Sequence, residues 1–183
     1  SENKRDLFRT SIVKLKIDDG NIEKSATGNV PGTPLNQFSF DEYEQELRIA
    51  TTIKPNDRDI SANDVYILDS ELNVIGSEKG MAECQRIYAV RFIGDKGYAI
   101  TYRQVDPLHV IDLSDSSNPT EVGTLKLPGF SEYLHKVDDG MILGVGESQN
   151  GKGKLVLFDV TNPANPKIAD DLIMKNTYST AVS

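Results

Sequence analysis

The sequence predicts an all-β fold, a partial β-propeller built from four-stranded antiparallel blades. Three observations predict it. Short apolar runs alternate with turn residues along most of the 183 residues. Three segments repeat one order of strand, aspartate, turn and strand, and the repeat length is about 40–45 residues, which is the length of a propeller blade.

The repeat is clearest in the second half of each unit. The three segments are "VYILDSELNVIG", "HVIDLSDSSNPTEVG" and "LVLFDVTNPANPKIAD". In each segment an aspartate (Asp69, Asp112 or Asp159) ends an apolar strand. Asn-Pro introduces the more polar outer strand in the last two segments, as expected for a strand entry or a sheet edge, where proline is tolerated because it lacks a backbone donor.

Another pair of strand-like runs precedes each segment. These pairs are "NQFSF" with "ELRIATTI", "IYAVRFI" with "GYAITYR", and "SEYLHKV" with "MILGVGE". The turn residues Gly94–Gly97 and Asp138–Gly140 separate the last two pairs and indicate hairpins. Runs such as "IYAVRFI" do not alternate with polar residues, which is typical of strands that are buried on both faces between neighbouring blades.

We therefore expect a single propeller fragment over residues 1–183. Its expected parts are an outer hairpin of a preceding blade (11–28), three blades (35–78, 84–127 and 130–174) and the start of a further blade (176–183). The stretch "SFDEYEQEL" offers an alternative, because Ser39 and Glu42 match a capping box for a short helix near Asp41–Glu46. We favour a strand there, because "ELRIATTI" follows where the second strand of the blade must be.

Two solutions exist for the blade faces at the ends of the repeat. In a fragment of a larger ring, the end faces expose apolar surface and favour self-association. In a minimal four-bladed ring, residues 11–28 supply outer strands to a blade whose inner strand begins near Tyr178. We favour the fragment, because a ring closed in this way lacks one strand and leaves hydrogen-bonding groups unpaired.

The runs "RQVDPLHVIDLSD" and "LPGFSEYLH" carry a family resemblance. Over roughly residues 10–175 the chain resembles the archaeal and bacterial family of secreted proteins that contain a C-terminal β-propeller domain. That family is distantly related to the tryptophan–aspartate repeat propellers. The resemblance implies an extracytoplasmic or secreted propeller, and it implies no activity and no catalytic residues.

The composition excludes several classes of partner. The formal net charge of −8 argues against nucleic acid, because affinity for phosphates comes largely from lysine and arginine. No apolar run approaches the roughly 18 residues of a membrane span, so we expect no membrane insertion. The single cysteine, Cys84, has no second cysteine with which to form an internal disulfide.

No motif indicates a catalytic residue, a metal or a cofactor. The run "GESQNGKG" nearly matches a phosphate-binding loop, but it lacks the serine or threonine that would hold magnesium and continues as a strand. The acidic turns lack the spacing of calcium ligands. We therefore expect no cofactor, no metal ligand and no catalytic residue.

Five residues are candidates for ligand binding. Arg91 interrupts an apolar inner strand and either lines the central channel or pairs between blades. Arg103 and Asp106 lie on the loop "YRQVDP" and either bind a ligand or form an ion pair that stiffens the loop. Glu132 and His135 are close in sequence and could contribute to a metal site, although the chain has only two histidines.

The leading functional prediction is a non-enzymatic extracytoplasmic scaffold or interaction module. Its partner would be a protein or extracellular ligand whose identity the sequence does not indicate. The alternative is a propeller enzyme, a hydrolase or lyase, with a cation-dependent site in the central channel. Such a site would need carboxylates that converge from different blades, and Glu42, Glu83 and Glu132 are the candidates.

Overall fold

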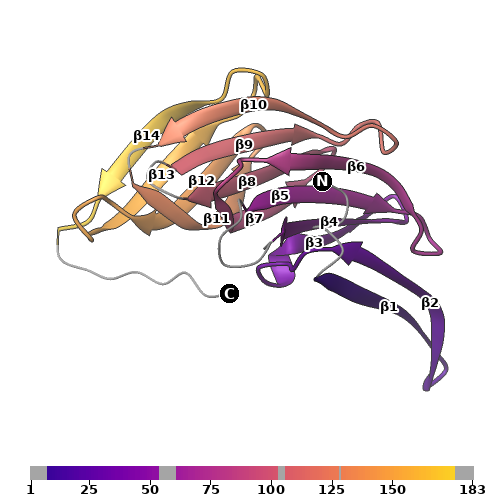
Figure 1. Cartoon of the computed structure of the whole chain (residues 1–183). Helices are drawn as coiled ribbons and strands as arrows, with labels where there is room; N and C mark the ends of the chain where they lie inside the picture. Colours follow the sequence, from indigo (N-terminus) through magenta and orange to yellow (C-terminus); the bar gives the residue numbers. More distant parts are fainter. Residues whose placement is uncertain (1–7, 54–60, 103–105, 128, 176–183) are drawn as a thin grey trace. The chain divides into compact units, whose positions relative to one another are not determined.

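The computed structural model describes residues 8–53, 61–102, 106–127 and 129–175. In this part of the chain all the regular structure is antiparallel β-sheet except for one helical turn (Figure 1). The prediction of an all-β partial propeller of four-stranded antiparallel sheets is therefore confirmed. The described residues also include no helix with the length and hydropathy that crossing a bilayer requires.

The chain divides into two compact units. The first unit comprises Ser1–Cys84 and Asp115–Pro119, and the second comprises Gln85–Ser114 and Thr120–Ser183. The short segment Asp115–Pro119 belongs to the first unit although both its flanking strands belong to the second. The expected start of a further blade, residues 176–183, lies outside the described residues.

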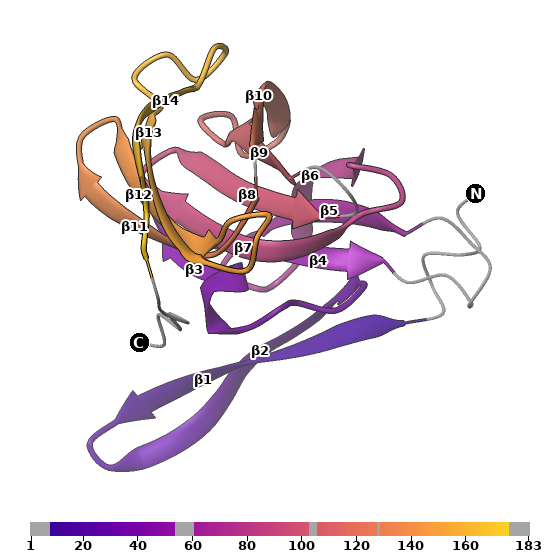
Figure 2. The same ribbon diagram turned by 90° about the vertical axis from the view of Figure 1, so that its left-hand side faces the viewer.

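The first unit contains a two-stranded and a four-stranded sheet. The two-stranded sheet pairs β1 (Arg9–Asp18) with β2 (Asn21–Pro31). The four-stranded sheet has the order β3 (Phe40–Tyr43), β4 (Glu46–Ile53), β5 (Ala62–Leu68), β6 (Val74–Met81). The β1–β2 hairpin extends past the four-stranded sheet, and among the described residues no third strand joins it (Figure 2).

A single helical turn, Gln37–Ser39, precedes β3. Its N-cap is Asn36, whose side-chain oxygen accepts the Phe38 N–H at 2.9 Å. The alternative of a helix near Asp41–Glu46 is wrong, and the favoured strand is present. Because Phe40 to Tyr43 pair with the apolar strand β4, cross-strand bonding prevails over the local capping signal.

The second unit contains two four-stranded sheets. The first has the order β7 (Arg86–Ile93), β8 (Lys96–Tyr102), β9 (Asp106–Asp112), β10 (Thr120–Leu127). The second has the order β11 (Phe130–Asp138), β12 (Met141–Glu147), β13 (Gly153–Asp159), β14 (Lys167–Ile173). Strands β7 and β11 lie side by side, so the inner strands of the two sheets contact each other (Figure 1).

Each unit has its own apolar core. In the first unit the core includes Val30, Ile49, Tyr66, Leu68 and Leu72. In the second unit both sheets contribute to the core, which includes Tyr98, Ile100, Leu108, Leu134, Ile142 and Phe158. The second and third strands of a sheet are buried on both faces, which explains why their sequences are nearly continuous apolar runs.

The three repeated aspartates cap the turn that follows the third strand of each sheet. In each case Oδ1 of the aspartate accepts the backbone N–H two residues later, which forms an Asx turn. The distances are 2.9 Å from Glu71 N to Asp69, 3.0 Å from Ser114 N to Asp112 and 3.0 Å from Thr161 N to Asp159. Hydrogen bonds from the turns, above all from Asn73, Ser114 and Thr161, lower the pKa of all three carboxyl groups.

These turns pack against a glycine in an outer strand. In the first unit the Ser116 carbonyl and Pro119 cover Gly76, so that a Cβ atom there would lie 1.9 Å from the carbonyl oxygen. In the second unit the Pro163 carbonyl covers Gly123, with a corresponding distance of 2.0 Å. Both outer strands therefore need a residue without a side chain at the point of contact.

Candidate functional site

Arg91 joins the two sheets of the second unit. Its Nε donates a hydrogen bond to the Leu134 carbonyl at 2.9 Å, and its guanidinium lies 5.2 Å from the centroid of the Tyr133 ring. Arg91 is on β7, whereas Leu134 and Tyr133 are on β11. Of the two roles considered for Arg91, the structure shows pairing between neighbouring sheets.

His135 and Glu132 lie on β11, close to that contact. The His135 ring stacks on Tyr133, and its Nδ1 lies 3.2 Å from the Tyr133 hydroxyl. Glu132 is exposed. No group of three or more histidine, cysteine, aspartate or glutamate side chains suited to hold a metal ion occurs in the described ranges. The structure thus brings Arg91 and His135 to the same ring, but it builds no ligand set around them.

The other two predicted residues are Arg103 and Asp106. Arg103 lies outside the described residues, and Asp106 is described only as the first residue of β9. Their ion pair stays a prediction. The glutamates considered for a channel site occupy unlike positions of the repeat: Glu42 in β3, Glu83 in the turn before β7, and Glu132 in β11.

Sequence reasoning missed a buried hydrogen-bond network around His109. Its Nε2 lies 2.9 Å from Thr101 Oγ1, and its Nδ1 lies 2.7 Å from Glu121 Oε1. Thr101 also donates to Gln85 Oε1 at 2.7 Å. Threonine, histidine and glutamate in this order have the composition of a nucleophilic triad. Thr101 is only 1% exposed, however, so no substrate reaches its hydroxyl, and the network stabilises the sheet.

Glu121 holds the outer end of this network. The hydrogen bond with His109 lowers the pKa of Glu121, against the opposing effect of burial. The Thr124 hydroxyl adds a second hydrogen bond to the same carboxylate oxygen at 2.7 Å. The signal in the sequence was a histidine inside the otherwise apolar run "LHVI", followed by a glutamate near the start of the next strand.

The turns of the second unit surround a pocket of about 480 Å³. Three connections form it: the β7–β8 turn, the β11–β12 turn and the start of the β13–β14 turn. The apolar part of its wall comes from Ile93, Met141, Ile142, Val160 and Pro163. Its size falls within the range of roughly 300–1,000 Å³ that is usual for ligand sites.

Charged side chains form the rim of this pocket. The Lys96 ammonium lies 2.9 Å from an Asp95 oxygen and 3.3 Å from Asp112 Oδ1. The Lys136 ammonium lies 2.8 Å from Asp139 Oδ1. Burial alone would lower the pKa of Lys96, but its bonds to the two aspartates outweigh burial and raise it. Both ammonium groups of the rim are therefore already ion-paired.

Tyr98 lines the same pocket from β8. Its side chain belongs to the apolar core and the residue is 6% exposed. Within the described part of the chain no residue forms a hydrogen bond with its hydroxyl. Burial raises the pKa of this phenol, so the group stays protonated. A buried hydroxyl without a protein partner loses free energy unless water or a ligand bonds to it.

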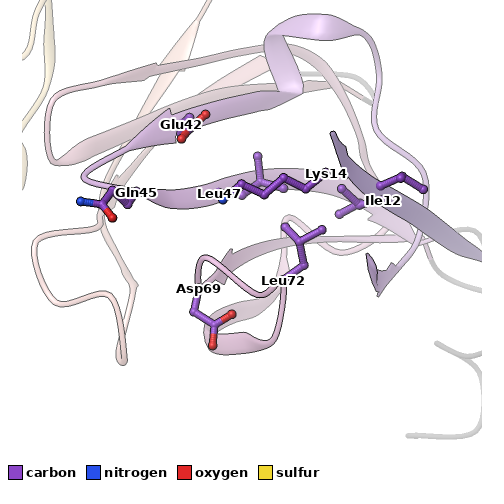
Figure 3. Close-up of a pocket in the computed structure, with 8 residues that line it drawn as sticks. Ile12, Lys14, Glu42, Gln45, Leu47, Asp69 and Leu72 are labelled. Carbon is purple, nitrogen blue, oxygen red and sulfur yellow. The ribbon is translucent and has the colours of Figure 1, made fainter. Parts of the chain in front are cut away.

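A smaller pocket of about 170 Å³ lies in the first unit. Ile12, Leu47 and Leu72 approach one another at its centre, whereas Gln45 and Asp69 lie farther out (Figure 3). The volume is below the range of most ligand sites, and the surface is mostly apolar. This pocket suits a single apolar side chain better than a small molecule.

The comparisons with known proteins agree with this architecture. The chain matches the β-propeller domain family over residues 1–183. It is 44% identical over 179 residues to an uncharacterized protein of Archaeoglobus fulgidus. The matched region covers 98% of this chain and 28% of that protein. It is also 44% identical over 173 residues to an uncharacterized protein of Methanocaldococcus jannaschii. This second matched region covers 94% of this chain and 27% of that protein.

The chain thus spans less than a third of the length of these archaeal relatives. The matched region includes the repeated aspartates, the outer-strand glycines and the turns around the larger pocket. The family match agrees with the four-stranded antiparallel sheets and with the side-by-side inner strands described above. The chain belongs to the β-propeller domain family.

Proposed function

We propose that this chain is a non-enzymatic, extracytoplasmic scaffold or interaction module. The observation that carries the proposal is the pocket of about 480 Å³ in the second unit, which is open at the turns and is lined by Tyr98, whose hydroxyl has no hydrogen-bond partner among the described residues. The triad-like set around His109 is sealed within its sheet and offers no reactive group. Binding, rather than chemistry, is what the accessible residues support.

Membership of the β-propeller family supports the general class, since propeller domains commonly act as interaction scaffolds. The extracytoplasmic location is the part of the proposal that depends on the resemblance to secreted propeller proteins. The archaeal relatives are much longer than this chain. That a longer protein containing this domain also acts as a scaffold or interaction module is therefore part of the proposal. Protease treatment of intact cells that produce the longer protein tests the location. Digestion without lysis is expected, and full protection would contradict the proposal.

Thermal unfolding with and without calcium or zinc separates the module from a cation-dependent enzyme. A ligand that binds only the folded state raises the unfolding temperature in proportion to its affinity and concentration. A module without a metal site should show no appreciable rise with either ion. A large, saturable rise would instead favour the enzyme.

Self-association is a further part of the proposal. The β1–β2 hairpin exposes Val13, Leu15, Ile17 and Ile22, with exposed fractions from 52% to 74%. Ile17 pairs with Ile22 across the hairpin, and Val13, Leu15 and Ile17 alternate along one face of β1. Light scattering should therefore show a mass that rises with concentration, and Leu15→Lys should reduce the rise. A constant monomer mass at high concentration would contradict this part.

A further inference from the structure

We infer that the pocket of the second unit binds the cationic side chain of an arginine or lysine in a partner polypeptide. The inference rests on the proposed function, because it names the chemical class of ligand for the same pocket. Three features carry it: the distribution of charge on the rim, the Tyr98 hydroxyl, to which no described residue bonds, and the apolar wall of the pocket.

The rim offers carboxylates to a ligand, whereas the two ammonium groups that the structure describes there are both ion-paired. Lys96 and Lys136 are both ion-paired within the rim, at 2.9 Å and 2.8 Å. Asp138 is exposed; its Oδ1 accepts the backbone N–H of Asp139 at 2.8 Å, and its charge also attracts the Lys136 ammonium, which is ion-paired with Asp139. An anionic ligand would have to break an existing ion pair, whereas a cation adds a partner to a carboxylate.

Tyr98 supplies the second contact. A phenol oxygen accepts a hydrogen bond as well as donating one, so it can accept an N–H from an ammonium or guanidinium group. Because the side chain is packed in the core, the hydroxyl is held in place before a ligand arrives, and little side-chain entropy is lost on binding. The hydroxyl is thus a preorganised acceptor next to a carboxylate rim.

The apolar wall suits the aliphatic part of the ligand side chain. Arginine and lysine carry a methylene stem that packs on apolar surface while the charged head stays near polar groups. Ile93, Met141 and Val160 line the pocket and present such a surface. The volume of about 480 Å³ also leaves room for the polypeptide backbone on either side of the inserted side chain.

A carbohydrate fits the pocket less well. Sugar rings stack on exposed aromatic faces, and Tyr98 is the one aromatic residue that lines this pocket in the described chain. Its 6% exposure leaves no ring face for stacking. The chain's net charge of −8 also favours approach of a basic segment over an acidic one.

The test is a titration of the whole 183-residue chain with blocked tripeptides. Acetyl-Gly-Arg-Gly-amide and acetyl-Gly-Lys-Gly-amide are the cationic probes, and the citrulline tripeptide is the neutral match to arginine. Amide NMR shifts at Gly94 and Gly140, which both line the pocket, report binding at the site. We expect both cationic probes to shift these amides, and the citrulline probe to bind about tenfold more weakly because a charged hydrogen bond becomes neutral.

Two substitutions test the named contacts. Tyr98→Phe should weaken binding of the arginine tripeptide by about tenfold to a hundredfold, the size of one lost hydrogen bond to a charged group. It should not lower the unfolding temperature, because no described residue bonds to that hydroxyl and the substitution removes a buried polar group. Asp138→Asn should weaken binding of both cationic probes to a similar degree, through loss of the carboxylate charge.

Tyr66→Phe is the matched control in the first unit. The Tyr66 hydroxyl bonds to Asp64 Oδ2 at 2.6 Å, and Tyr66 does not line the pocket. This variant should lower the unfolding temperature and leave the affinity for the arginine tripeptide unchanged. Tyr98→Phe is therefore expected to weaken binding without loss of stability, and Tyr66→Phe to lower stability without loss of binding.

Several results would overturn the inference. One is the absence of shifts at Gly94 and Gly140 with either cationic probe at millimolar concentration. Another is binding of an acidic or citrulline tripeptide as tight as that of arginine, which would contradict the cationic ligand while leaving an interaction module in place. Free arginine that binds as tightly as the tripeptide would assign the pocket to a small molecule. The proposed function itself fails separately, through metal-dependent stabilisation or protection from protease outside the cell.

Discussion

The two sheets of the second unit share their strand arrangement and register but differ in the side chains at equivalent positions. Each has four antiparallel strands, and the outer strand of each has a bulge at the same place in its register. The residue after the bulge is Gly123 in β10 and Asp170 in β14. Gly123 is covered by the Pro163 carbonyl of the following turn, whereas Asp170 is exposed.

A second difference lies in the middle of each sheet. The register makes His109 and Glu121 in one sheet equivalent to Val156 and Ile168 in the other. The first pair is joined by a hydrogen bond of 2.7 Å, and the second pair packs in the apolar core. The comparison teaches that the repeat constrains the backbone, while the turn–strand contact and the polarity of the side chain at a given position can differ between sheets.

Gly123→Ala should give the largest effect, because it breaks the contact that distinguishes β10 from β14. A Cβ atom would lie 2.0 Å from the Pro163 carbonyl oxygen, so the turn must move away from the strand. We expect a loss of about 3 kcal/mol in the free energy of unfolding, measured by urea denaturation. Asp170→Ala is the control at the equivalent exposed position and should cost less than about 0.5 kcal/mol. Equal losses in both variants would remove the distinction.

His109→Val tests whether the polar pair His109 and Glu121 can be exchanged for the apolar pair of the other sheet. Alone, it leaves the partly buried Glu121 carboxylate without its histidine and should cost about 2 kcal/mol. The double variant His109→Val with Glu121→Ile reproduces the pair found in the other sheet. It should recover most of that loss, as a thermodynamic cycle of the four proteins would show. Additive losses would mean that the two sheets are not interchangeable at this site.

Arg91→Met addresses the contact between the two sheets and should have a smaller effect. It removes the hydrogen bond of 2.9 Å from Nε to the Leu134 carbonyl, which lies on the other sheet. We expect a loss of about 1 kcal/mol. His135 occupies the equivalent position of β11 but is exposed, and His135→Met should cost less than about 0.5 kcal/mol. A cost at His135 as large as that at Arg91 would contradict this assignment.

The comparison also shows how far the sequence could predict the structure. The four-stranded sheets could be predicted because the turns at Gly94 and Asp138–Gly140 lie between apolar runs, which is a local signal. The His109 network could not, because its members come from three strands and become neighbours only through the register. The larger pocket was missed for a similar reason, since it combines turns from both sheets. No sequence signal distinguishes Tyr98 from a core residue, and only the structure shows that its hydroxyl has no partner among the described residues.

The smallest predicted effect concerns pH and the two aspartates that end β9 and β13. Hydrogen bonds from the Thr161 hydroxyl and backbone, with Lys167 at 3.2 Å, lower the pKa of Asp159 from 3.8 to about 2. Because the folded pKa lies below the unfolded one, this carboxylate stabilises the fold above about pH 4, and its contribution is lost as the pH falls toward 2.

Asp159→Asn keeps the oxygen that accepts the turn hydrogen bonds and removes only the charge. Urea unfolding at a series of acidic pH values should therefore show a weaker loss of stability in Asp159→Asn than in the unchanged chain. Asp112→Asn is the matched variant in the other sheet. The pKa of Asp112 is also lowered, chiefly by Ser114. Its smaller shift predicts that Asp112→Asn changes the loss of stability at acidic pH less than Asp159→Asn does. Equal changes in the loss of stability at acidic pH, or no change in either variant, would contradict this prediction. The turn after β13 would then not stabilise the charge of its aspartate more than the turn after β9 does.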